Sequence, residues 1–399
     1  MGGIGKTALA QQYIRVAQNE YPRGRWYFKV REQNLVTQLV SAAAMFDWQL
    51  PDSLTDDRSR ALWCYDRWCR EYPGPRLLLL DDVQHYGDIK HFLPNDPSFR
   101  VLMTSRRRFG KPVNRLDLGK LSLNEALELL TRLIEDDERV KEQQSEAEAL
   151  CKWVGQLPLG VELIARYLAL HPTLSFAKLQ ARLETKRLEA RALKQASEEV
   201  AYDQLEDYEK PLEAAFELSW QDLTPEAKTL MGLLSIFAPA PITQVLIAWA
   251  LPEWDEEDLE ERLDAVLVER NLLQSDIDGS YQLHQLLREF TTIKLATELS
   301  DQTSALQKGV ADSLINFAKR IQQIVTVSAQ QTVSEAIPHL ALVAQELNHL
   351  IENSTDAIWP FVGLGRFYQS QSLWPETTYW YKTCLKMTEE QFGSDHPDT

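Results

Sequence analysis

The sequence has few cysteines and no long apolar run, and both absences exclude classes of protein. The four cysteines, Cys64, Cys69, Cys151 and Cys384, form no CxxC pair, which argues against a zinc site and favours reduced thiols in a cytoplasmic protein. No apolar stretch is long enough to cross a bilayer, and the first residues lack the apolar core of a signal peptide. Lys6 stands where an N-myristoylation signal needs Ser or Thr. We therefore expect a cytoplasmic protein with no membrane partner.

Basic residues are also scarce. The chain has 42 Lys and Arg against 59 Asp and Glu, which gives a formal net charge of −17. Such a balance disfavours nucleic acid or an anionic membrane as the partner of the whole chain. The 399 residues are 44% hydrophobic, which is enough for several domains, each with its own core.

Helical and strand patterns alternate over the first 120 residues. The stretches "RWYFKV", "RLLLLDD" and "RVLMTSR" are short apolar runs, and helical spacing separates them. The run "RLLLL" has no polar alternation, as expected of a strand that is buried on both faces. The sequence therefore predicts an α/β domain with a parallel sheet.

Helical patterns dominate after residue 120. Ser122 is the expected N-cap of "LNEALELLTRLI", and Thr224-Pro225-Glu226 is expected to begin another helix. Residues 186–210 are charged and are interpreted as an exposed helix or linker. Two short apolar runs around Asp278-Gly279 predict a hairpin, and with the helices before it they suggest a winged-helix unit.

The opening stretch "GGIGKTALA" matches most of the Walker A pattern G-x-x-x-x-G-K-[ST]. Glycines allow the backbone to wrap with its N–H groups toward phosphate oxygens, at the positive end of the following helix. The lysine would reach the β and γ phosphates, and the threonine hydroxyl would bind Mg²⁺. The alternative is a flexible glycine-rich segment. The candidate phosphate-binding residues are Gly2, Gly3, Ile4, Gly5, Lys6, Thr7 and Ala8.

Two carboxylates end the buried run. Asp81 and Asp82 stand where a Walker B pair belongs, one to hold Mg²⁺ and the other to orient the attacking water. Arg106, after the next strand, is the candidate γ-phosphate sensor. The alternative for the two aspartates is an acidic turn after a strand, and the alternative for Arg106 is an ordinary surface arginine. The guanine-reading pattern N/T-K-x-D has one near match, Thr185-Lys186-Arg187-Leu188, which lacks the aspartate, so ATP and ADP are favoured.

The order of these motifs resembles the NB-ARC branch of the STAND signal-transduction ATPases. The matching stretches are "GGIGKTALA", "LLLLDD", "LMTSR", "GQLPLGVELIARYL" and "YQLHQLLREF", and they span roughly residues 1–300. The resemblance implies that Pro158 and Leu159 lie near adenine and that His284 contacts the ADP β phosphate in a closed state. The family motif often carries an aspartate next, whereas Gln285 stands here. Without the resemblance, a histidine beside a helix start is more often a cap or core residue.

The C-terminal part resembles tetratricopeptide repeats. The pattern W-x₂-L-G-x₂-Y, then A-x₃-F, is matched loosely by Phe361, Leu364-Gly365, Tyr368, Thr377 and Tyr381. The ending "GSDHPDT" resembles the junction between repeats of the kinesin-light-chain type. Repeats normally stack, and the first glycine of the Walker pattern would precede Met1, so the chain is expected to be a fragment at both ends.

Four domains are therefore expected. Residues 1–120 would form the P-loop nucleotide-binding domain, 121–200 a helical domain, 201–300 the winged-helix domain, and 301–399 a helical linker and the first repeats. The leading hypothesis is an ATP/ADP switch with slow ATPase activity, a protein or peptide ligand on the repeats, and homo-oligomers in the ATP-bound state. The alternatives are a winged-helix DNA-binding transcription regulator and a non-catalytic repeat scaffold. The segment "EWDEEDLEERLDAV" places carboxylates where DNA phosphates would lie and so disfavours the first alternative.

Overall fold

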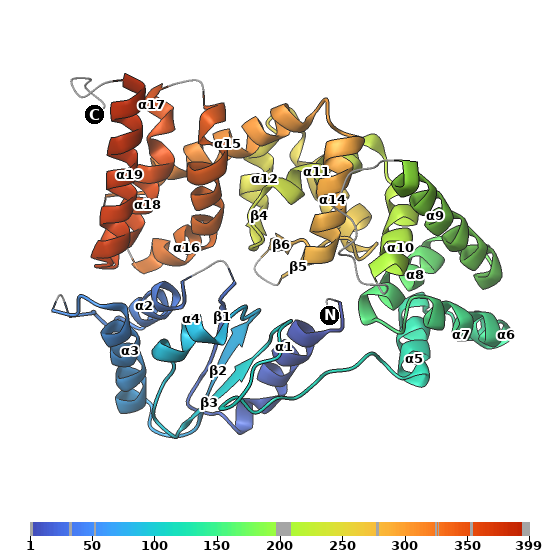
Figure 1. Cartoon of the computed structure of the whole chain (residues 1–399), viewed down its shortest axis with the longest axis horizontal. Coiled ribbons are helices and arrows are strands. Elements are labelled where there is room, and N and C mark those ends of the chain that lie inside the picture. Colours follow the sequence, from blue (N-terminus) through green and yellow to red (C-terminus); the bar gives the residue numbers. More distant parts are fainter. Residues whose placement is uncertain are drawn as a thin grey trace. The chain divides into compact units, whose positions relative to one another are not determined.

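The structure is a computed structural model of the whole chain (Figure 1). It describes residues 3–31, 34–51, 53–196, 209–276, 279–323, 325, 327–351 and 354–392. Gly2, Asp278 and the stretch "GSDHPDT", all named above, lie outside the described residues, as does part of the charged segment 186–210. Contacts divide the chain into two compact units, each assembled from separate segments.

The first unit comprises residues 1–5, 116–235 and 253–303 and is almost entirely helical. Ser122 caps its first long helix through a capping box with Glu125, as the sequence predicts. Another predicted helix begins at Pro225, where the Thr224 hydroxyl accepts the Ala227 amide at 3.3 Å. The elements of this unit are α5 (Leu123–Ile134), α6 (Asp137–Glu142), α7 (Gln144–Trp153), α8 (Pro158–Leu170), α9 (Phe176–Ala196), α10 (Glu209–Gln221), α11 (Pro225–Ile236), α13 (Glu256–Glu261), the π-helix η3 (Arg262–Val268), β5 (Gln274–Ser275), β6 (Ser280–Gln282) and α14 (Gln285–Thr297).

The predicted hairpin is present in this unit. Strands β5 and β6 pair antiparallel, with Gln274 opposite Gln282 and Ser275 opposite Tyr281. The charged segment continues α9, so its first part is helix up to Ala196.

The second unit comprises residues 6–115, 236–252 and 304–399 and contains a parallel three-stranded sheet. Its elements are α1 (Lys6–Val16), η1 (Ala17–Asn19), β1 (Arg25–Lys29), α2 (Leu35–Met45), α3 (Asp57–Glu71), β2 (Arg76–Asp81), α4 (Tyr86–Ile89), η2 (Lys90–Phe92), β3 (Phe99–Met103), β4 (Ile242–Thr243), α12 (Gln244–Ala250), α15 (Thr303–Arg320), α16 (Val327–Leu342), the π-helix η4 (Val343–Leu347), η5 (Asn348–Leu350), α17 (Ser354–Ala357), α18 (Trp359–Ser370) and α19 (Trp374–Phe392).

The sheet has the order β1-β2-β3, and all three strands coincide with the apolar runs of the sequence (Figure 1). Every residue of the central strand β2 is buried, which confirms the prediction made from its lack of polar alternation. Because the strands are parallel, their carboxyl ends meet at one edge of the sheet, where ligands of open α/β sheets bind. Asp81 ends β2 at that edge.

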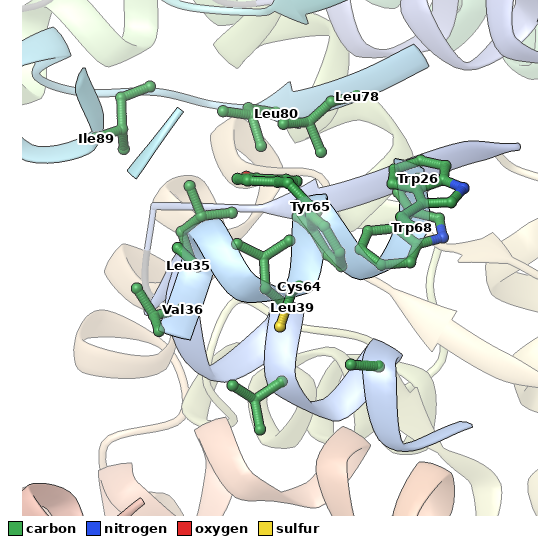
Figure 2. Close-up of a cluster of buried hydrophobic side chains, with 14 of the residues drawn as sticks. Trp26, Leu35, Val36, Leu39, Cys64, Tyr65, Trp68, Leu78, Leu80 and Ile89 are labelled. Atoms are coloured by element: carbon green, nitrogen blue, oxygen red, sulfur yellow. The ribbon is translucent and has the colours of Figure 1, made fainter. Parts of the chain in front are cut away.

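One face of the sheet packs on an aromatic and aliphatic cluster from α2 and α3 (Figure 2). Trp26 of β1 stacks on Trp68 of α3, with ring centroids 4.0 Å apart. Stacked aromatic pairs add about 0.5–1.5 kcal/mol beyond the burial of their area. This cluster fixes β1 and β2 against α3 and so holds the carboxyl edge of the sheet in place.

The C-terminal helices α18 and α19 pack side by side, and Tyr368 of α18 and the turn between the helices contribute to the same cluster (Figure 1). Leu373, in the turn between them, is fully buried among the cluster residues. Arg60 of α3 donates to the Ser372 carbonyl at 3.2 Å, and the Ser41 hydroxyl of α2 donates to the Gln371 side chain at 2.8 Å. This turn, residues 371–373, therefore joins the last helices to the sheet.

Candidate functional site

The carboxylate of Asp81 is the best-connected group at the carboxyl edge of the sheet. The Thr7 hydroxyl donates to Oδ1 at 2.8 Å, and the Thr104 hydroxyl donates to the same oxygen at 2.5 Å. The Tyr27 hydroxyl donates to Oδ2 at 3.0 Å. The side chain is buried, and a buried charge of this kind is tolerated when it is hydrogen-bonded on all sides. Three elements of the unit thus converge on one carboxylate.

Asp82 follows the strand in an unusual backbone conformation. Its φ of +55° lies in the left-handed region, which aspartate tolerates better than most residues. Its amide donates to the Thr104 hydroxyl at 2.9 Å, and its carboxylate pairs with the Arg31 guanidinium at 3.1 Å. Thr104 therefore links the two aspartates, since it accepts from one backbone and donates to the other side chain. The side chains of Arg31 and Asp82 are 27% and 29% exposed, so this carboxylate remains accessible.

Lys6 lies close to both aspartates and to Arg106. Burial, and then the positive charge of Arg106, lower the pKa of the Lys6 ammonium, while Asp82 and Asp81 oppose the shift. A partly buried lysine whose pKa is lowered by burial and a second cation is typical of a functional site. A bound anion would favour the charged ammonium, so this group of charges suits a ligand that carries negative charge.

Two glycines before Lys6 adopt backbone conformations that other residues resist. Gly3 has φ +69° and Gly5 has φ +80°, and α1 begins directly after them. The loop of residues 3–5 therefore leads into the N-terminus of an 11-residue helix, where unpaired N–H groups favour an anion. Ile4 is buried, whereas Ala8 is exposed on α1.

Within the first unit, the same glycines contact residues far along the chain. The Leu159 amide donates to the Gly3 carbonyl at 3.4 Å, and Pro158 is the first residue of α8. A Cβ at Gly5 would lie 3.8 Å from Pro158, and one at Gly3 would lie 3.6 Å from Leu286. The structure thus brings the loop glycines together with Pro158, Leu159 and the start of α14.

His284 is the N-cap of α14. Its Nδ1 accepts the Leu286 amide at 3.2 Å, so the neutral ring carries its proton on Nε2. The capping role weighed from the sequence is therefore present. In this neutral form Nε2 carries the proton, and an N–H group of this kind can donate to a phosphate oxygen.

Sequence patterns missed three residues that contact the aspartates: Tyr27, Arg31 and Thr104. Thr104 stands inside the stretch "LMTSR", where only the arginine was singled out. Tyr27 lies between the buried Trp26 and Phe28 on β1. Strand alternation therefore places its side chain on the opposite face of the sheet, and this was the signal that could have identified it. Arg31 carries no local signal, since its partner is 51 residues away.

The donor set at Asp81 fits Mg²⁺ better than a metal with an all-protein cage. Among the described residues, no group of three or more His, Cys, Asp or Glu side chains is placed to hold a metal ion. Mg²⁺ usually takes one or two carboxylates together with waters and substrate phosphates. The Thr7 hydroxyl and the Asp81 carboxylate, 2.8 Å apart, are a set of that kind.

The chain is similar to bacterial regulatory proteins. It is 28% identical over 328 residues to "Regulatory protein AfsR" of Streptomyces griseus, and 27% identical over 329 residues to that of Streptomyces coelicolor. Each alignment covers 79% of this chain and 31% of the relative, so the chain spans about a third of the length of these relatives. No family model matches the chain.

Within the described part of the chain, no helix combines the length and the apolar character that a bilayer span requires.

Proposed function

We propose that this chain is a regulatory switch that binds ATP and ADP in a P-loop site. One observation carries the proposal: the Thr7 hydroxyl donates to the Asp81 carboxylate at 2.8 Å, across 74 residues of sequence. Thr7 follows the "GK" of the Walker A stretch, and Asp81 ends the central strand, so both halves of a phosphate and Mg²⁺ site meet.

The residues would divide the work as follows. Lys6 and Arg106 supply positive charge for the β and γ phosphates, and the loop of residues 3–5 supplies backbone N–H groups. Thr7 and Asp81 would hold Mg²⁺, which neutralises phosphate charge when bound. Asp82, which remains accessible beside them, would orient the attacking water.

Three residues that the family resemblance singles out, Pro158, Leu159 and His284, would distinguish the nucleotide states. Pro158 and Leu159 would lie near adenine, and the Nε2 proton of His284 would contact the ADP β phosphate. A nucleotide shifts a switch only by its difference in affinity for two states, so ADP must favour a closed state and ATP an open one. Hydrolysis would be slow and would reset the switch.

The C-terminal helices would receive the signal. In this proposal α18 and α19 begin a tetratricopeptide-like array that binds a protein or peptide ligand, and the ATP-bound form assembles into homo-oligomers. The buried turn 371–373 gives such a ligand a physical connection to the sheet, because Leu373 packs in the cluster beside β1 and β2.

A nucleotide titration tests the proposal directly. The unaltered chain is expected to bind ADP and Mg²⁺-ATP but not GTP, and Lys6→Ala is expected to abolish binding. The matched control is Lys90→Ala, which removes an exposed lysine from η2 of the same unit. Unchanged ATP affinity in Lys6→Ala shows that the site assignment is wrong.

A DNA-binding regulator is the second hypothesis, because the relatives are named as regulatory proteins. Helix α13 disfavours DNA contact through this part of the chain, since its exposed surface carries the carboxylates of Glu256, Glu257, Asp258, Glu260 and Glu261. Salt-dependent binding to duplex DNA in the absence of nucleotide would favour the second hypothesis. A scaffold without nucleotide function is excluded by ATP binding that Lys6→Ala abolishes.

A further inference from the structure

Strand β1 presents two different faces. Trp26 and Phe28 point into the aromatic and aliphatic cluster, where Figure 2 shows Trp26 against Trp68. Tyr27, between them, points to the other face and bonds Asp81. Because side chains alternate along a strand, Tyr27 and Lys29 belong to that same face of β1. This face of β1 therefore runs toward the two aspartates.

The register of the sheet continues past the end of β1. Lys29 pairs with Asp81, and the Val30 amide donates to the Asp81 carbonyl at 3.0 Å. The next residue, Arg31, is thereby held beside Asp82, whose carboxylate it contacts at 3.1 Å. Each aspartate at the carboxyl edge thus has its own donor from β1 or the residues directly after it.

We propose that Tyr27 and Arg31 are positioning residues for the two carboxylates, Tyr27 for Asp81 and Arg31 for Asp82. The proposal deepens the nucleotide function and depends on it. Tyr27 donates to Oδ2 of Asp81, and Oδ1 is the oxygen that accepts from Thr7. With Thr7, this carboxylate would hold Mg²⁺. Arg31 pairs with Oδ2 of Asp82 at 3.1 Å and so restricts the orientation of that carboxylate.

The two residues are expected to affect different quantities. Partners of metal ligands set the orientation of the ligand, and their removal weakens metal binding or activity by about 10- to 100-fold. Tyr27→Phe should therefore raise the Mg²⁺ concentration needed for half-maximal ATP binding about tenfold or more. A charge-assisted hydrogen bond has roughly twice the strength of a neutral one. Arg31→Gln should therefore lower the single-turnover rate of hydrolysis about tenfold or more, with ATP affinity unchanged.

A double-mutant cycle separates positioning from a general structural effect. In an Asp82→Asn background, Arg31→Gln is expected to slow hydrolysis no further, because both changes act on one group. Arg31→Lys keeps a cation and should recover part of the rate, although it loses the planar fork. Thermal melting of each variant by circular dichroism identifies any that fail to fold, and Arg31→Lys then carries the test.

Two matched controls lie in the same unit. Tyr13→Phe removes a hydroxyl that contacts Tyr21 at 3.1 Å rather than a carboxylate of the site. Arg100→Gln removes a strand guanidinium that bonds the Pro97 carbonyl at 2.9 Å. Both controls are expected to keep the Mg²⁺ dependence and the rate of the unaltered chain.

The outcomes distinguish this inference from the proposed function. If the unaltered chain binds no nucleotide, the proposed function fails and the inference with it. If it binds nucleotide but does not hydrolyse ATP, binding stands and the role of Arg31 is overturned. If it hydrolyses ATP and Arg31→Gln matches the rate of Arg100→Gln, or Tyr27→Phe keeps the Mg²⁺ dependence of Tyr13→Phe, the corresponding positioning role is wrong.

Discussion

The turn between α18 and α19 offers a prediction whose size follows from burial. Leu373 has no solvent exposure and belongs to the cluster that supports the sheet, so Leu373→Ala leaves a cavity in the core of that unit. Buried Leu→Ala changes cost about 2–5 kcal/mol, and the upper part of the range applies where the surroundings collapse least. Here two hydrogen bonds, from Arg60 and Ser41, hold the backbone and side chains of the turn in place and limit collapse.

Hydrogen exchange of the β2 amides measures this loss of stability in the core of the sheet. The β2 amides of Leu78 and Leu79 lie in the centre of the sheet, and their exchange reports the opening of its core. A loss of 2 kcal/mol corresponds to exchange that is about 30-fold faster, at about 1.4 kcal/mol per tenfold. The control is Leu385→Ala, which truncates a leucine of α19 that is 43% exposed and should change stability by less than about 0.5 kcal/mol.

The reasoning is refuted if Leu373→Ala accelerates exchange at Leu78 and Leu79 no more than Leu385→Ala does. The C-terminal helices would then be joined to the sheet more loosely than the burial of Leu373 implies. A supporting result would show that the last helices and the sheet core share stability, which a switch with a C-terminal sensor requires.

Three further predictions concern the charge of Lys6, the packing of Gly365 and the role of His284 in ADP binding. Burial and Arg106 lower the pKa of Lys6 in the folded protein. The charged ammonium therefore lowers the free energy of unfolding at pH values below that pKa, and this destabilisation disappears as pH rises toward the ordinary value of 10.5. Lys6→Met should therefore abolish nucleotide binding without lowering Tm, and Tm of the unaltered chain should approach that of the variant as pH rises; a lower Tm for Lys6→Met at every pH contradicts this. Gly365→Ala should destabilise the α18–α19 pair in urea unfolding, because the new Cβ would overlap the ring of Tyr381; an unchanged unfolding midpoint would contradict close packing at this position. His284→Ala should weaken ADP binding and speed nucleotide exchange, and the account of this histidine fails if both stay as in the unaltered chain.

Local patterns predicted the elements that local physics controls. The three strands follow from short apolar runs, the start of α5 from the Ser122 capping box, and the hairpin from two runs around a turn. Each of these signals lies within a few residues of the element that it predicts. The match of the opening stretch to the Walker A pattern is also a local signal, and the site that it predicts stays a prediction.

Contacts between distant segments could not be read from the sequence. Tyr27 and Arg31 contact the two aspartates only when β1 pairs with β2, more than 50 residues later in the chain. The turn 371–373 enters a core whose other buried members all lie between Trp26 and Phe99, and its contact with Ser41 spans 330 residues. Nor does any local pattern mark the π-helical segments η3 and η4. These features depend on tertiary packing, which local propensity does not encode.

The central claim is that the hydroxyl of Thr7 and the carboxylate of Asp81 form one Mg²⁺-nucleotide site, and a pair of substitutions at Thr7 tests it most directly. Thr7→Ser keeps the hydroxyl, whereas Thr7→Val keeps the shape and removes it. Isothermal titration with ATP in the presence and absence of Mg²⁺ is expected to show Mg²⁺-dependent affinity in the unaltered chain and in Thr7→Ser, and loss of that dependence in Thr7→Val. Equal Mg²⁺-dependent affinity in all three proteins, or no ATP binding by the unaltered chain, would contradict the account.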